Sequence, residues 1–292
     1  MIELSNADKI ALLTDSTADL TPAMREGKPI YVVPLKIVCA DGEYSDGVDI
    51  FARDVYERLH RGELPQTSLP DGGSISDTLD RIKADGYEKV LAVMLSSGLS
   101  GTYNMVRLQA ESRKDLEIAV FDSKSGSLGM GSMVLQLWEE IQAGVGWDEL
   151  VGRKAPRLIA NTFPFFSVDT LEYLSKGGRI GKVTALAGTL LSIKPLITFA
   201  EDGQLQSVAK VRGRHQVQNK LLELMTQHLR PGVRYNVCIA HGGAQSELAQ
   251  LAARVKERFP QPEHFWQGEM DATLSVYIGD GVLGGCIQLL ED

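Results

Sequence analysis

A turn rich in serine and glycine is the stretch of this sequence best suited to hold a ligand. Residues 93–104 read VMLSSGLSGTYN, and in them an apolar run gives way to a polar turn and then to sequence compatible with a helix. Where a parallel strand ends in such a turn, the first N–H groups of the next helix and the hydroxyls of Ser96, Ser97 and Ser100 converge on one spot. The pattern predicts an anion site for a carboxylate or a phosphate group. The residues alone leave a second interpretation open, in which Ser100 caps the helix and the glycines relieve backbone strain.

The signatures of common catalytic sites are absent from the sequence. There is no HExxH motif and the five histidines are scattered, so no metal site is predicted. Residues 98–102, GLSGT, do not match the nucleophile elbow GxSxG, and no GxGxxG follows the first predicted strand. Residues 175–184, SKGGRIGKVT, differ from a phosphate-binding loop, because Lys176 replaces its first glycine and Val183 its serine or threonine. We therefore predict no catalytic residue.

The composition is that of an ordinary globular protein and argues against several functions. The chain has 292 residues, of which 43% are hydrophobic and 23% charged. Its formal net charge of −8 argues against binding to nucleic acid. The sequence has no signal-peptide pattern and no apolar stretch long enough to span a membrane, so no transmembrane segment is expected. Cys39, Cys238 and Cys286 form no CxxC pair, which is typical of buried, reduced thiols in the cytoplasm.

Strands and helices alternate through the first half of the chain. Residues 89–95, KVLAVML, form an apolar run without alternation, which is typical of a strand buried on both faces of a parallel sheet. Val134, Leu137, Trp138 and Ile141 have the spacing of a helix that faces a core. The further expected strands are 10–13, 30–38 and 117–123, and the further expected helices are 51–61, 75–86 and 101–111.

The second half differs in pattern, because extended segments follow one another around turns. Residues 192–213 are expected to form two extended segments about a turn at 201–203, and residues 273–289 are expected to be extended sequence with four glycines. The predicted fold class is α/β with two domains. An N-terminal domain, residues 1–155, would hold an open, mostly parallel sheet with helices on both faces, and a C-terminal α/β domain, residues 156–292, a mixed sheet. The loop at about 62–74 is expected to cross between the domains.

Eight short segments, found in the same order, resemble the DegV family of lipid-binding proteins. Each segment alone is a weak signal, but eight in order are highly specific, and GDGVLGG at 279–285 is a weaker ninth match. The eight are TDSTADL at 14–20, VVPLKI at 32–37, YSDGVDI at 44–50, TSLP at 67–70, SSGLSGTYN at 96–104, FDSKSGSLGMG at 121–131, LEYLSKGGRIG at 171–181 and LLSIKPLI at 190–197.

The resemblance implies a two-domain α/β fold with a long-chain fatty acid buried between the domains. In many bacteria such proteins present the acid to a separate kinase, which phosphorylates its carboxyl group. The family's carboxylate ligands match Thr67 and Ser97, and Ser96 and Gly98 of the same turn belong to the expected ligand-binding set. The family's KGGR turn ends here at Arg179, which is implied to meet the kinase partner and would suit an acidic or phosphate-bearing surface.

The sequence departs from the family pattern around the expected head group. Tyr277 stands where the family usually has a histidine, so a phenol that donates a hydrogen bond replaces a group that can become cationic. Asp280 replaces the usual proline, and Asp71 replaces the usual serine after TSxP. An added carboxylate repels a bound carboxylate unless it faces solvent. The identity of the head group is therefore less defined than the fold.

Three classes of function remain open at this point. The resemblance favours a non-catalytic lipid-binding protein. Its ligand would be a fatty acid, its partner a fatty acid kinase, and it would need no further cofactor. Whether it meets a membrane surface is left open. The first alternative is a stand-alone enzyme for acyl or phosphoryl transfer, which would turn over without a partner. The second is a regulatory protein that acts through protein contacts.

Overall fold

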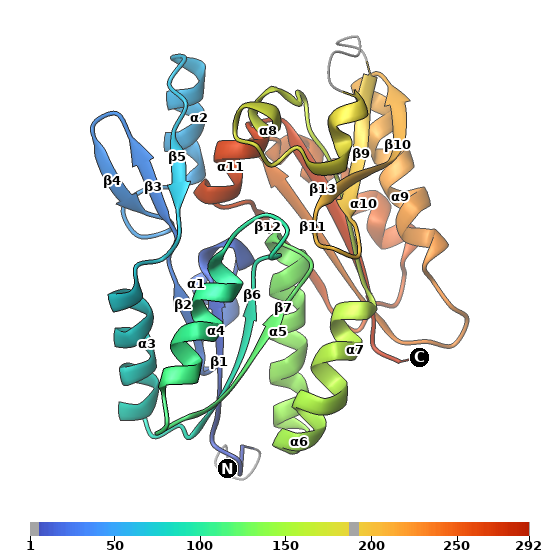
Figure 1. Cartoon of the computed structure of the whole chain (residues 1–292). Coiled ribbons are helices and arrows are strands. Elements are labelled where there is room, and N and C mark those ends of the chain that lie inside the picture. Colours follow the sequence, from blue (N-terminus) through green and yellow to red (C-terminus); the bar gives the residue numbers. More distant parts are fainter. Residues whose placement is uncertain (1–5, 187–192, 292) are drawn as a thin grey trace.

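The computed structural model describes residues 6–186 and 193–291, and these residues form three sheets with helices packed around them (Figure 1). The two larger sheets flank helix α5 (Ser127–Gln142), which contacts strands of both. The predicted α/β class is confirmed, with a parallel sheet in the N-terminal part and a mixed sheet in the C-terminal part. No helix of the described residues combines the length and the apolar character needed to cross a membrane.

The N-terminal sheet is parallel throughout and has the strand order β2-β1-β6-β7. Helices α3 (Gly72–Ala84) and α4 (Thr102–Ser112) cover one face, and α5 covers the other. The apolar run predicted to be buried on both sides is β6, which confirms that expectation. The strands are β1 (Ile10–Asp15), β2 (Ile30–Val33), β6 (Lys89–Met94) and β7 (Glu117–Asp122).

The C-terminal sheet has six strands in the order β10-β9-β8-β13-β11-β12 and is mixed, because only β11 and β12 pair in parallel. Helices α9 (Val217–Gln227) and α10 (Gln245–Arg258) pack on its outer face. The predicted pair of strands around a turn is β9 and β10. The strands are β8 (Thr162–Ser167), β9 (Ile193–Phe199), β10 (Leu205–Arg212), β11 (Tyr235–Gly242), β12 (Phe265–Glu269) and β13 (Val282–Leu289).

A small antiparallel sheet was not predicted. The segment 30–38 is not one strand, because the chain leaves the parallel sheet at Pro34, which has no N–H to donate, and enters the small sheet. The small sheet consists of β4 (Gly42–Ser45), β3 (Lys36–Cys39) and β5 (Gln66–Ser68). Helix α2 (Ala52–His60) lies between β4 and β5 in the chain and packs on this sheet. Part of the expected loop at 62–74 is thus a strand, and it carries Thr67.

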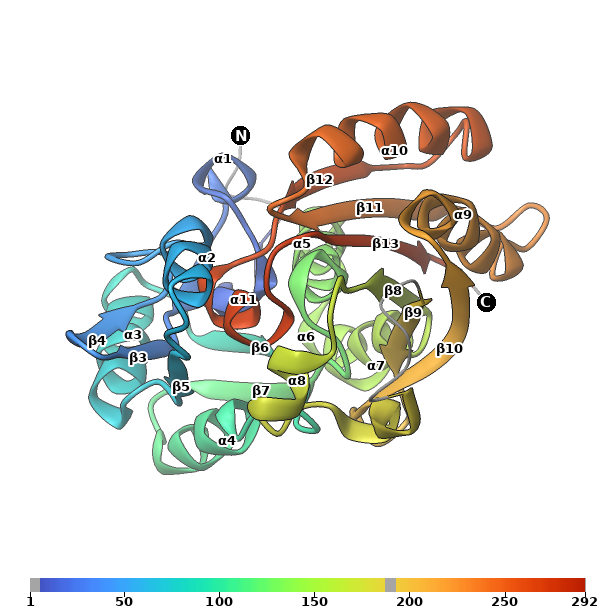
Figure 2. The ribbon, with the colours of Figure 1, turned by 90° about the horizontal axis from the view of Figure 1, so that it is seen from above.

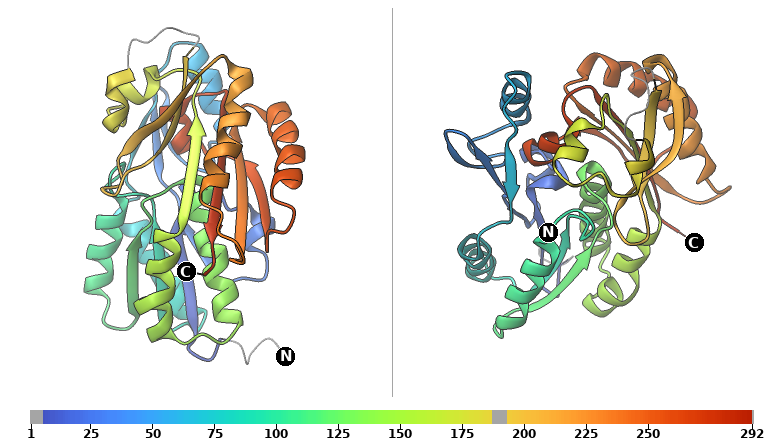
Figure 3. Two further views of the ribbon diagram at one scale, coloured as in Figure 1. Left: turned by 90° about the vertical axis from the view of Figure 1, so that its right-hand side faces the viewer. Right: turned by 45° about the horizontal axis from the view of Figure 1, so that its top comes forward.

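Helix α11 (Ala272–Ile278) was expected to be extended, and this prediction was wrong. The Asp271 side chain accepts a hydrogen bond from the Leu274 N–H and caps the helix. Figures 2 and 3 show α11 between the small sheet and the six-stranded sheet, and its residues Ala272 and Val276 pack with β3 and α2. The predicted division between residues 155 and 156 stays a prediction; it falls inside α7 (Ala155–Ala160), which packs on α5.

Short helical segments complete the described chain. They include the turn after β1 and helix α8, which the KGGR turn follows. These segments are η1 (Ser16–Ala18), α1 (Pro22–Arg25), α6 (Trp147–Glu149), η2 (Leu150–Lys154), α8 (Glu172–Lys176), η3 (Gly181–Leu186) and η4 (Arg214–Gln216).

Candidate functional site

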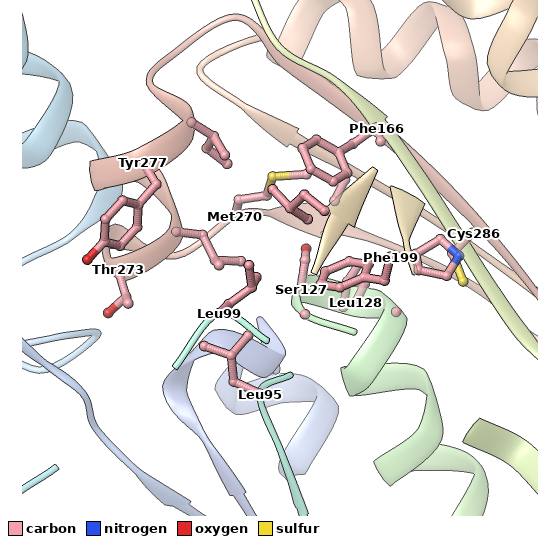
Figure 4. Close-up of a pocket in the computed structure, with 18 of the residues that line it drawn as sticks. Leu95, Leu99, Ser127, Leu128, Phe166, Phe199, Met270, Thr273, Tyr277 and Cys286 are labelled. Atoms are coloured by element: carbon pink, nitrogen blue, oxygen red, sulfur yellow. The ribbon is translucent and has the colours of Figure 1, made fainter. Parts of the chain in front are cut away.

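An elongated pocket lies where the carboxyl end of the parallel sheet faces the inner side of the six-stranded sheet (Figure 4). Its wall is formed by the turn after β6, the start of α5, strands β8, β9, β11 and β13, and helix α11. Figure 4 shows Tyr277 and Thr273 at one side of the pocket and Cys286 at the opposite side, with Met270, Leu128 and Phe199 between them. The pocket therefore runs from the small sheet toward the interior of the C-terminal sheet.

The sheet wall of the pocket is made of small side chains. Cys238 and Ala240 of β11 lie directly opposite Cys286 and Gly284 of β13, and all four line the pocket. Because alternate residues of a strand point to opposite faces, their neighbours Leu283 and Ile287 instead pack under α9 and α10. The small residues leave space against the sheet that larger apolar residues would fill.

The opposite end of the pocket carries the polar groups. The Thr67 hydroxyl and the Tyr277 phenol are 2.5 Å apart, and both residues line the pocket. The Arg179 guanidinium lies 4.8 Å from the centroid of the Tyr277 ring, a cation–π contact. Arg179 is held there because its Nε donates to the Leu99 carbonyl at 3.3 Å and its Nη1 donates to the Gly177 carbonyl at 2.8 Å. This end therefore offers hydroxyl donors beside a fixed positive charge.

A second hollow lies on the outer side of the same polar groups. Thr67, Arg179 and Tyr277 line both the pocket and this hollow, which also borders Tyr173 and Lys176. The Thr67–Tyr277 hydrogen bond thus stands between the apolar pocket and the hollow. A ligand head group bound at this pair would lie next to the surface of the molecule.

Ser97 is not among the residues that line the pocket. Its backbone N–H donates to the Asp122 carboxylate at 3.0 Å, and its hydroxyl bonds to the second oxygen of that carboxylate. Lys124 makes an ion pair with Asp122 at 2.8 Å and lies 3.5 Å from the Ser97 hydroxyl. Hydrogen bonds from Lys124 and Ser97 outweigh the desolvation of Asp122 and lower the pKa of its carboxyl. The anion that the turn holds in this structure is therefore the carboxylate at the end of β7.

Ser96 and Gly98 also lie outside the pocket lining and contact the turn between β9 and β10 instead. The buried Ser96 hydroxyl donates to the Gly203 carbonyl at 2.7 Å. A Cβ atom at Gly98 would lie 2.2 Å from the carbonyl carbon of Gly203, so only glycine permits this close approach. These two residues bring the β6–α4 turn and the β9–β10 turn together.

Three further hydroxyl residues line the pocket: Ser100, Ser127 and Thr273. The Ser100 hydroxyl lies 2.9 Å from the Thr102 hydroxyl and accepts from its N–H at 3.3 Å, so Ser100 serves the start of α4 and the pocket wall together. Ser100 was named above with the other hydroxyls of the turn, and only its position in the fold separates it from Ser97. No sequence signal distinguished Ser127 or Thr273.

Buried carboxylates stand directly behind this polar wall. The Ser127 hydroxyl donates to Asp19, and the Thr273 hydroxyl donates to Asp46 at 2.7 Å. Burial raises the pKa of the Asp19 carboxyl to about 7, although hydrogen bonds from the Asp271 N–H and Ser127 oppose the shift. Burial and the neighbouring carboxylates Asp46 and Asp19 likewise raise the pKa of Asp271. The two pocket hydroxyls thus point at acids and are fixed by them.

The cavity is narrow for a long ligand. Its volume is about 90 Å³, whereas pockets for small-molecule ligands have roughly 300–1,000 Å³. The lining includes flexible side chains, among them Met270, Leu99 and Leu274. A ligand with a long chain fits only when such side chains move apart.

One group of residues in the described part of the chain has the spacing of a metal site. Cys39, Asp41 and Glu63 offer ligand atoms within 4.8 Å of one another. Arg58 forms ion pairs with Asp41 at 2.9 Å and with Glu63 at 3.1 Å, so both carboxylates are already paired with one guanidinium. This cluster lies in and beside the small sheet, and none of its residues lines the pocket.

Comparison with known proteins relates the whole chain to one family. The family model described as "Uncharacterised protein, DegV family" matches residues 9–289. A DegV domain-containing protein of Clostridium acetobutylicum is 39% identical over 277 residues, which cover 95% of this chain and 98% of that protein.

Solved structures with high similarity carry names that mention fatty acids. A fatty-acid-binding DegV family protein from Thermus thermophilus superposes with a TM-score of 0.89 at 29% identity, covering 96% of this chain and 99% of that one. A stearic-acid-binding protein from Eubacterium ventriosum superposes with a TM-score of 0.86 at 26% identity, covering 96% and 98%.

Proposed function

The chain belongs to the DegV family, and from this membership we propose that its pocket binds one long-chain fatty acid. The carboxylate lies at Thr67 and Tyr277, and the acyl tail extends toward Cys286. The observation that carries the proposal is the lining of the pocket, which is mostly apolar and has Thr67, Arg179 and Tyr277 at the end next to the surface hollow. The similar proteins named as binding fatty acids support it.

The tail and the head group contribute differently to binding. Burial of an acyl chain gives roughly 0.8 kcal/mol per methylene, so about fifteen methylenes give a gross term near 12 kcal/mol. A hydrogen bond to a charged group contributes roughly 1.5–3 kcal/mol. The tail therefore dominates affinity, and the head contacts decide which end of the ligand lies at the surface.

The head-group contacts follow from the polar end of the pocket. A carboxylate that inserts between the Thr67 hydroxyl and the Tyr277 phenol accepts a hydrogen bond from each. The Arg179 guanidinium, held over the Tyr277 ring, supplies the positive charge that a histidine at position 277 would otherwise provide. Ser100 is a further hydroxyl donor of the pocket wall, whereas Ser97 acts through Asp122 and Lys124.

The surface hollow suits a partner that works on the carboxylate. Lys176, Arg179 and Tyr173 border it, and so do Thr67 and Tyr277, where the head group binds. Lys176 is paired with Glu172 at 2.6 Å, so Arg179 is the basic side chain that here favours a partner surface with acidic groups or a bound phosphate. We therefore assign Arg179 two roles, orientation of the carboxylate and contact with a kinase, while the chain itself remains non-catalytic.

Native mass spectrometry of protein purified from bacteria without added lipid tests this function. The wild type is expected to retain one fatty acid per chain, and the Thr67→Val/Tyr277→Phe double variant is expected to lose it. Tyr103→Phe is the matched control, since it removes a phenol of α4 that does not line the pocket. Wild-type protein that carries no lipid and gains no thermal stability from added fatty acids would contradict the proposal.

Incubation with fatty acid, ATP and magnesium separates a carrier from an enzyme. The carrier forms no acyl phosphate until a fatty acid kinase is added. Acyl phosphate formed by the purified chain alone would instead establish the stand-alone enzyme.

A further inference from the structure

Two of the three cysteines face each other at the apolar end of the pocket. Cys238 of β11 and Cys286 of β13 are direct partners in an antiparallel register that is unbroken from Tyr235–Leu289 to Gly242–Val282. Both thiols are free and buried, with exposed fractions of 1% and 4%. Cys39 lies apart from them, in β3 and in the core of the small sheet.

The backbone geometry of this pair suits a covalent bridge. The Cα atoms of directly opposite residues in an antiparallel pair are about 4.5 or 5.5 Å apart. Disulfides span Cα separations of about 4.4–6.8 Å, so the separation expected for this pair lies within the range of a disulfide. Gly284 and Gly285 precede Cys286 and leave the strand there without side chains that would resist a small adjustment.

Access to the two thiols runs through the pocket. Both cysteines line it, and Figure 4 shows Cys286 at the side opposite Tyr277. The outer face of the same strands is covered by α9 and α10, so a reagent cannot approach from that side. An acyl tail that fills the pocket therefore covers both sulfur atoms.

We propose that Cys238 and Cys286 form a redox-modification site that closes into an intramolecular disulfide when the apolar end is empty and stays reduced when an acyl tail covers it. The second half of this inference rests on the proposed function. In the reaction both S–H bonds break and one S–S bond forms. Two electrons and two protons pass to a small two-electron oxidant; with diamide, the azo bond becomes a hydrazine. Burial and the Cys238 thiol raise the pKa of the Cys286 thiol. Because the thiolate is the reactive form, oxidation of this buried pair is expected to be slow.

The test treats the delipidated full chain with diamide, with and without palmitate, and follows the loss of two hydrogen masses per chain. Fatty acid at about ten times its Kd leaves roughly one tenth of the molecules empty, so the rate of bridge formation is expected to fall about tenfold. Non-reducing peptide mapping is expected to place the bridge between residues 238 and 286. Cys238→Ser and Cys286→Ala, each checked for its melting temperature, are expected to abolish it, whereas Cys39→Ser leaves it unchanged.

Equal rates of bridge formation with and without palmitate, a bridge that uses Cys39, or no bridge below the unfolding temperature would each overturn the inference. Native mass spectrometry of the same samples separates this failure from a failure of the proposed function. Palmitate that is bound while the oxidation rate stays unchanged refutes the protected site alone. A bridge that forms equally fast in a protein that binds no palmitate refutes both.

Discussion

The polar end of the pocket joins side chains from three distant segments, whereas the apolar end is one face of a continuous strand pair. Thr67 and Tyr277, which share a hydrogen bond, are 210 positions apart, and Arg179 reaches them from the turn after α8. Cys238 and Cys286, by contrast, meet through the regular register of β11 and β13. The polar end thus depends on how the small sheet, α8 and α11 pack, while the apolar end depends on residue size at alternate strand positions. Substitutions at each end separate the two contributions.

The largest effect is expected from a substitution that fills the apolar end. In Ala240→Leu, the larger side chain extends from the sheet wall and occupies space that about three methylenes of the acyl tail would fill. Losing the burial of these methylenes weakens palmitate binding by roughly 2.4 kcal/mol, or about 50-fold. Isothermal titration with a series of chain lengths measures the effect, and the preferred acid is expected to be shorter by about three carbons. Val208→Leu, at an exposed position of β10, is the control. Unchanged palmitate affinity in the Ala240 variant would mean that the tail does not reach β11.

Two single substitutions in the turn after β6 test which serine contributes to the polar end of the pocket. Ser100→Ala is expected to weaken fatty-acid binding about tenfold, because it removes a donor of the pocket wall. Ser97→Ala is expected to leave affinity within about twofold, since its hydroxyl bonds to Asp122 rather than facing the pocket. Titration with palmitate measures both. The reverse order would assign the carboxylate to Ser97 and imply that Asp122 is displaced on binding.

Replacement of Arg179 tests whether charge matters at the polar end. Arg179→Gln is expected to weaken palmitate binding about fivefold, because a partly exposed ion pair contributes up to about 1 kcal/mol. Hexadecanol, which has the same tail and no charge, is expected to bind both proteins equally, and Arg179→Lys is expected to retain most of the affinity for palmitate. A loss of similar size for the acid and the alcohol would show that Arg179 only supports the position of Tyr277.

The smallest effect on binding is expected from substitution of the buried acids behind the polar wall. Their substitution is expected to change the pH dependence of stability instead. Asp19 has a folded pKa of about 7 and Asp15 of about 6, well above the unfolded value near 3.9. The folded state therefore keeps protons that the unfolded state loses, and this stabilisation, complete below about pH 4, disappears as the pH rises to 7. Asp19→Asn is expected to reduce the fall in the free energy of unfolding between pH 4 and 7. Asparagine also tolerates the positive φ of 55° at this position.

Urea unfolding at several pH values measures this slope, and Asp77→Asn, at an exposed position of α3, is the control. A slope identical to that of the wild type would show that Asp19 is ionised throughout this range. Palmitate affinity at pH 8 is expected to change less than about twofold, because Ser127 keeps a hydrogen-bond partner in the variant.

Local pattern predicted much of the scaffold. The apolar run of β6, the helical stripe of α5 and the strand pair β9–β10 were all recognisable, because burial on one or two faces leaves a direct periodicity in the sequence. The short helix α11 was missed, since seven residues with β-branched members resemble a strand and only the Asp271 cap marks a helix. The small sheet was missed because its strands have three or four residues each.

The candidate site was predicted residue by residue only in part. Thr67, Tyr277 and Arg179 were named in advance, and the structure brings these three together. Ser97 and Ser100 are three positions apart in one turn, and the sequence could not tell which of them faces the pocket. That choice depends on Asp122, a residue 25 positions from Ser97, whose carboxylate occupies one side of the turn.

By itself, the sequence determined which segments are buried, where strands end in polar turns and which family the chain resembles, because periodicity, capping and short motifs are local properties of the chain. Only the tertiary structure decided which hydroxyls line the pocket, that α11 carries the polar end, and that Cys238 and Cys286 are neighbours. Each of these depends on contacts between residues far apart in sequence, and such contacts exist only once the sheets and helices have packed together.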